Sequence, residues 1–129
     1  MKQKNKLTLT LLKGKLGVCH FPSHFPIPDW AKQCAFCSIT RTSDGLSIIA
    51  PQELIPGGIL VEKDWRVFKV KGPLGFLLTG IVSSISTPLA EAGISILYVS
   101  TYETDYLLVK EEDLKKAIKI LKRSFIINV

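Results

Sequence analysis

Residues 94–129, ISILYVSTYETDYLLVKEEDLKKAIKILKRSFIINV, decide the fold of this chain. Branched and aromatic residues predict a strand over 94–100 and a returning strand over 105–110, joined by a turn at 102–104. Three acids at 111–113 then precede an apolar stripe at helical spacing, and basic residues gather near its end, as a helix dipole favours. The last five residues predict a further strand. This part is therefore expected to form strand, strand, helix, strand.

The residues just upstream complete this pattern. Alternation over 65–71 predicts a strand. Apolar residues at 81, 82, 85, 89 and 92 follow helical spacing, Gly93 is a natural stop, and Pro88 predicts a kink or a late start. The order becomes β-α-β-β-α-β, a ferredoxin-like arrangement of the α+β class with helices on one face of an antiparallel sheet.

The front half resembles a degraded copy of the same unit. Residues 7–12 predict a strand, and three prolines within 22–28 exclude a long helix, leaving a short helical turn near 29–33 with Asp29 as its cap. Residues 34–41 and 46–50 predict a hairpin, followed by a helical piece at 51–54. Each half has one apolar sheet face, so we expect tandem units that pack together or dimerise.

Composition limits the class of protein. The 129 residues are 47% hydrophobic and 22% charged, which excludes global disorder. No apolar span reaches the roughly 18–20 residues needed to cross a bilayer, and no signal peptide is evident, so we expect a cytoplasmic protein with no membrane partner.

The net charge of +6 is concentrated in lysines that precede Asp29. They could touch nucleic acid, but no arginine or nucleic-acid motif accompanies them. A solvated strand end explains them better, and we expect no nucleic-acid partner.

Three cysteines, Cys19, Cys34 and Cys37, form an odd count, which argues against a disulfide framework and fits a reducing compartment. Together with His20 they could form a zinc site, because Cys34 and Cys37 have zinc-like spacing. The strand expected at 34–41 would point these two thiols to opposite faces, so we expect buried free thiols and no metal.

A nucleophilic triad is the enzyme hypothesis that the sequence allows. His20 and His24 lie near Ser23 and Asp29. The segment is rich in proline, however, and has no nucleophile elbow or identifiable oxyanion loop. We therefore expect no enzymatic activity and no cofactor.

Five segments carry a likeness to a known family: WRVFKV at 65–70, GPL at 72–74, TGIV at 79–82, PLAEAGI at 88–94 and STYETDYLLV at 100–109. Together they resemble the ACT domain, especially that of small prokaryotic tandem-ACT proteins, the C-terminal ACT domain of aspartate kinases and the cytosolic arginine sensors of animals. The likeness is good over 59–129 and weaker over 36–42 and 45–49. We therefore expect a degenerate ACT-like unit at 1–62 and an ACT domain at 63–129.

The resemblance implies a regulatory module that binds an amino acid or another small metabolite between paired ACT units, most simply in a homodimer. The pocket would use the loop before the first helix and the facing edge of the second strand. In this chain these positions are Gly75, Leu78, Thr79, Gly80, Ile81, Thr101, Tyr102, Thr104 and Asp105.

The chemistry of these positions suits a zwitterion. Free amides at 79–81 open a helix and favour a carboxylate, while Asp105 can accept from an ammonium. Leu78 stands where the arginine sensors carry an acid, which favours an amino acid with an apolar side chain. The alternatives are that the glycines only shape a turn, that Asp105 only satisfies hairpin amides, and that the chain is a structural module for self-association without a ligand.

Overall fold

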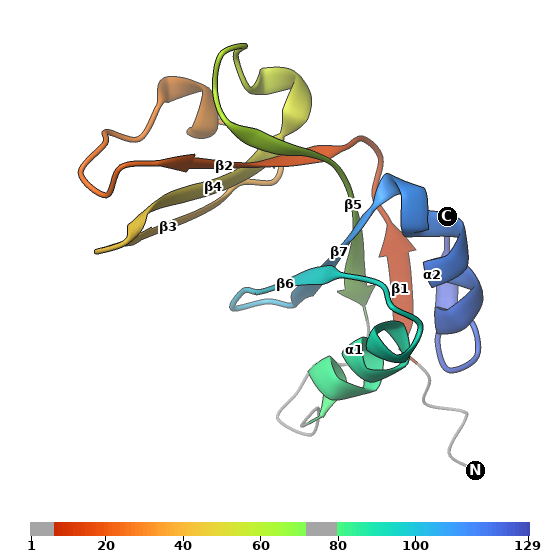
Figure 1. Ribbon diagram of the computed structural model, residues 1–129. Helices are drawn as coiled ribbons and strands as arrows, with labels where there is room; N and C mark the ends of the chain where they lie inside the picture. Colours follow the sequence, from red (N-terminus) through yellow and green to blue (C-terminus); the bar gives the residue numbers. More distant parts are fainter. Residues whose placement is uncertain (1–6, 72–79) are drawn as a thin grey trace. The chain divides into compact units, whose positions relative to one another are not determined.

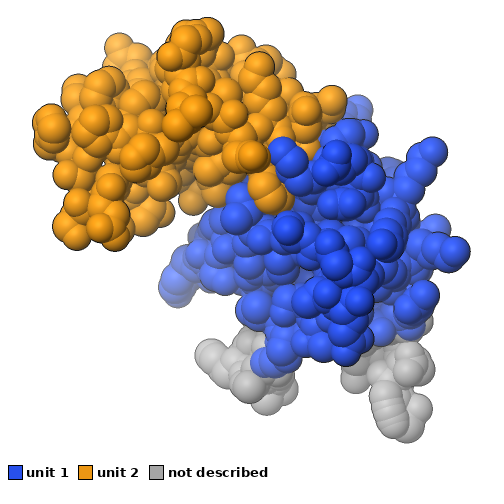
Figure 2. Space-filling model, in the orientation of Figure 1, with its two compact units in different colours: residues 1–13, 66–129 blue, residues 14–65 orange. Residues whose placement is uncertain are grey.

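The computed structural model describes residues 7–71 and 80–129. The chain forms two compact units, unit 1 with residues 1–13 and 66–129 and unit 2 with residues 14–65 (Figures 1 and 2). The long strand β5 (Val61–Lys71) contributes its first half to unit 2 and its second half to unit 1. No described helix is long and apolar enough to span a membrane.

Unit 1 has the predicted order of strand, helix, strand, strand, helix, strand. After β5 come α1 (Ile81–Glu91), β6 (Ile96–Ser100), β7 (Asp105–Lys110), α2 (Leu114–Leu121) and β8 (Ile126–Asn128). Strand β7 pairs with both β5 and β6, and α1 runs through Pro88 to its end. A short 3₁₀ turn of the three acids at 111–113 leads into α2.

Strand β1 (Thr8–Leu11) confirms the strand predicted at 7–12, but it lies in unit 1 rather than opening the front half. It runs antiparallel to β5 and parallel to β8, so that Leu9 is opposite both Val70 and Ile127. The two compact units thus differ from the expected domains 1–62 and 63–129 at residues 1–13, which belong to unit 1, and at residues 63–65, which belong to unit 2. The division into domains stays a prediction.

The core of unit 1 lies between its sheet and both helices. Apolar side chains of β1, β5 and β7 meet those of α1 and α2 on one face of the sheet, as Figure 1 shows for the helices. The fully buried members are Leu9, Phe68, Ile85, Leu89, Leu107, Val109 and Ala117. Lys116 on α2 donates to the carbonyl of Ala92 at 3.0 Å, which satisfies a carbonyl just beyond the end of α1.

Apart from β1, which lies between β5 and β8 in unit 1, unit 2 has the equivalent strand order, and it has no α-helices. Strands β3 (Ser38–Thr42), β4 (Gly45–Pro51), β2 (Leu16–Phe21) and the start of β5 lie side by side in that order, each antiparallel to its neighbour. The 3₁₀ turns η2 (Asp29–Ala31) and η3 (Gln52–Leu54) stand at the two helix positions. The prediction of a degenerate ferredoxin-like unit is confirmed.

Three sequence predictions in unit 2 were wrong. Strand β2 was missed because the prolines that follow it suggested an irregular segment, although the first of them, Pro22, comes directly after the strand ends. Asp29 does not cap η2, since Pro28 holds the cap position. The hairpin strand expected from residue 34 begins only at Ser38.

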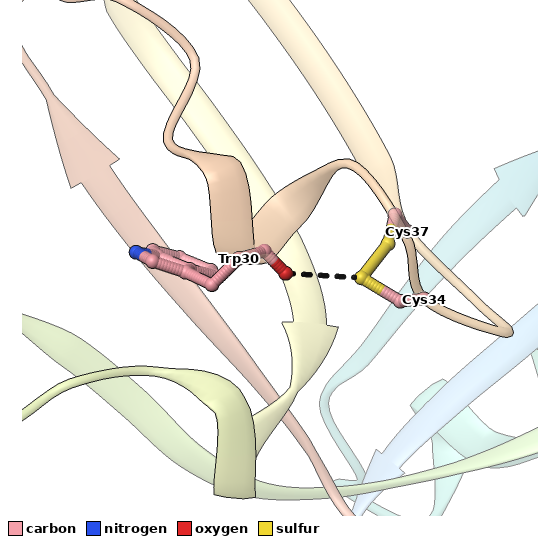
Figure 3. Close-up of a disulfide and its surroundings, with 3 residues drawn as sticks. All are labelled: Trp30, Cys34 and Cys37. Atoms are coloured by element: carbon pink, nitrogen blue, oxygen red, sulfur yellow. Dashed lines mark hydrogen bonds between the residues drawn. A yellow bond between two sulfur atoms is a disulfide. The ribbon is translucent and has the colours of Figure 1, made fainter.

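The late start of β3 also overturns the prediction of free thiols. Cys34 and Cys37 lie in the loop between η2 and β3, with their Cα atoms 5.8 Å apart, and form a disulfide (Figure 3). The sulfur of Cys34 lies 3.5 Å from the carbonyl oxygen of Trp30. Cys19 is a buried free thiol on β2, and burial raises its pKa.

Candidate functional site

The predicted site residues divide into three groups. Gly75, Leu78 and Thr79 lie outside the described residues. Gly80 and Ile81 begin α1. The other four, Thr101, Tyr102, Thr104 and Asp105, form the turn between β6 and β7 and the first position of β7.

Gly80 sets the start of α1 by its backbone conformation. It has a φ of 90°, in the left-handed region that favours glycine, and its carbonyl accepts from the Ser84 amide at 2.9 Å and from the Ser83 hydroxyl at 3.2 Å. A Cβ added there would meet only the Ser83 oxygen, at 4.0 Å. Glycine is therefore required by conformation and not by space. The next residue, Ile81, is buried and anchors the helix start in the core of unit 1.

The β6–β7 turn is closed by a local hydrogen-bond network. The amide and hydroxyl of Thr101 both donate to the Thr104 carbonyl at 2.8 Å, and the Thr104 amide donates back to the Thr101 hydroxyl at 3.1 Å. Thr104 is 7% exposed and its hydroxyl donates to the carbonyl of Val70. The turn is thus fixed to the end of β5, the strand from which residues 72–79 lead to Gly80.

Asp105 is held by a residue that the sequence analysis missed. The Tyr98 hydroxyl donates to a carboxylate oxygen of Asp105 at 3.0 Å. Burial, followed by the hydrogen bond and the negative charge of Asp105, raises the pKa of Tyr98 well above its usual range, so the phenol stays protonated. The register could have indicated this pair, because Ser100 is opposite Asp105 and residues 98 and 100 share a face of the hairpin.

The structure therefore brings Thr101, Thr104 and Asp105 together at one end of the sheet of unit 1. Ile81, the first residue of α1, belongs to the same core cluster as Val70, which lies near the end of β5. Tyr102 is fully exposed at the tip of the turn. A carboxylate has several acceptor positions, so Asp105 can serve Tyr98 and an ammonium together.

Several residues that the sequence suggested for a metal site or a catalytic triad form other interactions. The Asp29 carboxylate pairs with Lys32 at 3.1 Å, and the thiols of Cys34 and Cys37 are joined. Among residues 7–71 and 80–129, no three His, Cys, Asp or Glu side chains are grouped closely enough to hold a metal ion.

Comparison with protein families identifies this arrangement. The model described as ACT domain matches residues 60–123, which include α1, the β6–β7 turn and α2. The chain belongs to the ACT domain family. A second family model, for an N-terminal domain, matches residues 14–58, which fall within unit 2.

Known proteins similar to this ACT protein include sensors and a bacterial protein of the same size. The chain is 37% identical over 104 residues to the cytosolic arginine sensor for mTORC1 subunit 1 of Bos taurus, and the match covers 72% of this chain and 32% of the sensor. The crystal structure of protein Atu0741 from Agrobacterium tumefaciens matches with a TM-score of 0.89 and 38% identity, over 96% of this chain and 95% of that one.

A more distant likeness concerns the fold alone. Aspartokinase III of E. coli, solved with aspartate and ADP, matches with a TM-score of 0.64 and 10% identity over 92% of this chain and 32% of the enzyme. The ACT protein thus spans about a third of the length of both the arginine sensor and the aspartokinase.

Proposed function

We propose that this ACT protein is a regulatory module that binds an amino acid at the end of the unit 1 sheet and has no catalytic activity of its own. The arrangement of the β6–β7 turn carries the proposal. It presents the Asp105 carboxylate on a turn that Thr104 fixes to β5, next to the strand end from which the chain continues to Gly80 and α1. In the bound state, the ligand ammonium would meet Asp105 and its carboxylate would meet the opening amides of α1.

The relatives support the class of ligand. The similar sensors are named for arginine, and the aspartokinase of similar fold was solved with aspartate. In the sequence Leu78 comes two residues before Gly80, and we propose an amino acid with an apolar side chain rather than arginine. Gly75, Leu78 and Thr79 belong to the proposed site with the described residues.

The proposed setting is a cytoplasmic homodimer or tandem pair in which ligand binding changes how ACT units associate. The fully exposed aromatic ring of Tyr102 suits a contact with a second copy of the chain. Any regulated activity would then reside on another polypeptide.

A thermal-shift screen of the twenty amino acids tests the proposal, because a ligand that binds only the folded state raises Tm. We expect one apolar amino acid to raise Tm, and Asp105→Asn to remove the response while keeping an oxygen that accepts from Tyr98. Glu103→Gln is the matched control, since Glu103 is an exposed acid in the same turn, and it should respond as the wild type does.

Two outcomes would count against the proposal. A response to arginine above all others would overturn the assignment of an apolar ligand. The absence of any response, combined with Tm values that fall on dilution, would favour the structural role in self-association instead.

A further inference from the structure

A cavity lies entirely within unit 2 and includes none of the residues of the proposed amino-acid site. It has a volume of about 570 Å³ and lies between the start of β2, the 3₁₀ turn η3, the loop at 55–59 and the start of β5. Sites for small molecules typically measure about 300–1,000 Å³. The cavity is therefore large enough for a metabolite, and most of its lining lies within residues 14–58, which the N-terminal family model matches.

We propose that this cavity binds a small organic carboxylate with a short branched apolar chain. The lining combines two kinds of side chain. Ile55, Ile59 and Val61 supply apolar surface, and Lys15, Lys63 and Glu53 are the charged members of the lining. A lysine ammonium is a strong donor to a carboxylate, and an apolar wall beside it selects a ligand with a hydrocarbon body.

The ammonium of Lys15 is positioned by a network of Asp64 and Gln52. Asp64 lies 3.6 Å from the Lys15 nitrogen and is held twice by Gln52, whose amide nitrogen donates to its carboxylate at 3.1 Å and whose amide oxygen accepts from its backbone amide at 2.7 Å. The backbone N–H of Gln52 also donates to the Lys15 backbone carbonyl at 3.0 Å. An ammonium has three donors, so the pair with Asp64 leaves donors for a ligand.

Asp64 has a φ of 68°, the one positive value at a non-glycine position among the described residues. Left-handed conformations at residues other than glycine are costly and concentrate where a structure holds groups for binding. With this backbone conformation, the amide and the carboxylate of Asp64 both form hydrogen bonds with Gln52. The two bonds fix the position of the carboxylate that pairs with Lys15.

Three glycines leave the rim of the cavity open. A Cβ added at Gly14, Gly57 or Gly58 would meet no atom within 4 Å, so a ligand can approach the backbone at these positions. Gly57, unlike the other two, does not have the positive φ that resists a side chain. Gly57→Leu should therefore fill the cavity without straining the fold, which gives the proposal a direct test.

Calorimetry with three branched probes, isovalerate, α-ketoisocaproate and leucine, tests the ligand class, with isovaleramide as the uncharged analogue of the first. We expect saturable binding of at least one carboxylate and none of isovaleramide. If leucine binds best, Glu53→Gln should weaken leucine binding, because glutamine holds the ammonium of the ligand less well than glutamate does. If a probe without an ammonium binds best, the same variant should bind it as tightly as the wild type or more tightly.

Variants locate the site. Lys15→Gln should weaken binding at least about tenfold, the loss expected when a charge-assisted hydrogen bond is removed. Lys13→Gln is the matched control, because Lys13 is exposed two residues earlier and does not line the cavity. Gly57→Leu should abolish binding and keep the wild-type Tm, and NMR shifts caused by the probe should concentrate at residues 52–59.

The proposal fails if no carboxylate probe saturates, if isovaleramide binds as tightly as isovalerate, or if Lys15→Gln binds like the wild type. It is independent of the proposed amino-acid site. Asp105→Asn should therefore leave isovalerate binding unchanged, and an effect of this variant equal to that of Lys15→Gln would also overturn it.

Discussion

Units 1 and 2 share the order of four strands, apart from β1 inserted in unit 1, but cover their sheets differently. In unit 1 two α-helices supply about half of the buried apolar cluster, including Ile85, Leu89 and Ala117. In unit 2 the buried cluster is smaller, and Trp30 and Cys34 pack against it from η2 and the disulfide loop. The difference teaches that one topology can be maintained either by helix packing or by short, locally fixed segments.

Proline accounts for the loss of the first helix in unit 2. Pro22, Pro26 and Pro28 lie where unit 1 has α1, and a proline within a helix removes a hydrogen bond and clashes with the preceding turn. The segment is fixed instead by Arg41, which donates to the carbonyls of Ser23 and Phe25, and by the stacked rings of Phe21 and Phe25.

The largest expected effect concerns the helix-dependent core of unit 1. Ile85→Ala should lower the free energy of unfolding by about 2–5 kcal/mol, because Ile85 is fully buried and its loss leaves a cavity. Chemical denaturation measures this. Val82→Ala on the exposed face of the same helix should change stability by less than about 0.5 kcal/mol. Equal effects at both positions would contradict helix packing as the main source of stability in unit 1.

The disulfide is the corresponding test for unit 2. Replacing Cys34 and Cys37 together by serine should cost about 2 kcal/mol, the chain-entropy value for so short a closed loop. Adding reductant to the wild type should give a similar loss, and the double variant should be insensitive to reductant. A wild type whose denaturation midpoint is the same with and without reductant would contradict a structural role for this bond.

Much of unit 1 was predictable from sequence because its elements obey regular periods. Strand β7 was predicted at its observed bounds, 105–110, and α1 was found from helical spacing with Gly93 as its stop. The place of β1 between β5 and β8 was not predictable, since strand pairing over more than 50 residues leaves no local signal.

Unit 2 was harder because its elements are short. Strand β2 directly precedes a proline-rich segment, which obscured it. The odd count of cysteines argued against a disulfide, and the strand expected at 34–41 placed the thiols of Cys34 and Cys37 on opposite faces. For the candidate site, the sequence indicated the turn and Asp105, but Tyr98 becomes evident only from the register of β6 and β7.

Two glycines, one from each unit, sharpen the comparison at the backbone level. Gly80→Ala should cost about 1–2 kcal/mol, because alanine resists the left-handed conformation observed there. Gly57→Ala should be neutral or stabilise by up to about 1 kcal/mol, since it reduces the freedom of the unfolded chain at an unstrained, open position. Thermal denaturation of both variants checks this. A larger loss of stability in Gly57→Ala than in Gly80→Ala would contradict the conclusion that Gly80, and not Gly57, needs the conformational freedom of glycine.

The smallest expected effect concerns the Tyr98–Asp105 pair. Tyr98→Phe should cost about 1 kcal/mol at neutral pH, the usual net contribution of a hydrogen bond. The pKa of Tyr98 is raised in the folded protein, so the fold holds the phenol proton more tightly than the unfolded chain does. This contribution is complete below the unfolded pKa of about 10 and is lost as the pH rises beyond it.

Stability should therefore fall less steeply above about pH 10 in Tyr98→Phe than in the wild type, as measured by denaturation over a series of alkaline buffers. Tyr102→Phe is the matched control, because it removes the hydroxyl of a fully exposed tyrosine that takes no part in the Tyr98–Asp105 pair. If the slope were equally steep in all three proteins, other groups would cause the alkaline loss, and Tyr98 would not be the residue that holds Asp105 in place. Unit 1 would then hold the Asp105 carboxylate by the β6–β7 turn alone, just as unit 2 relies on short, locally fixed segments.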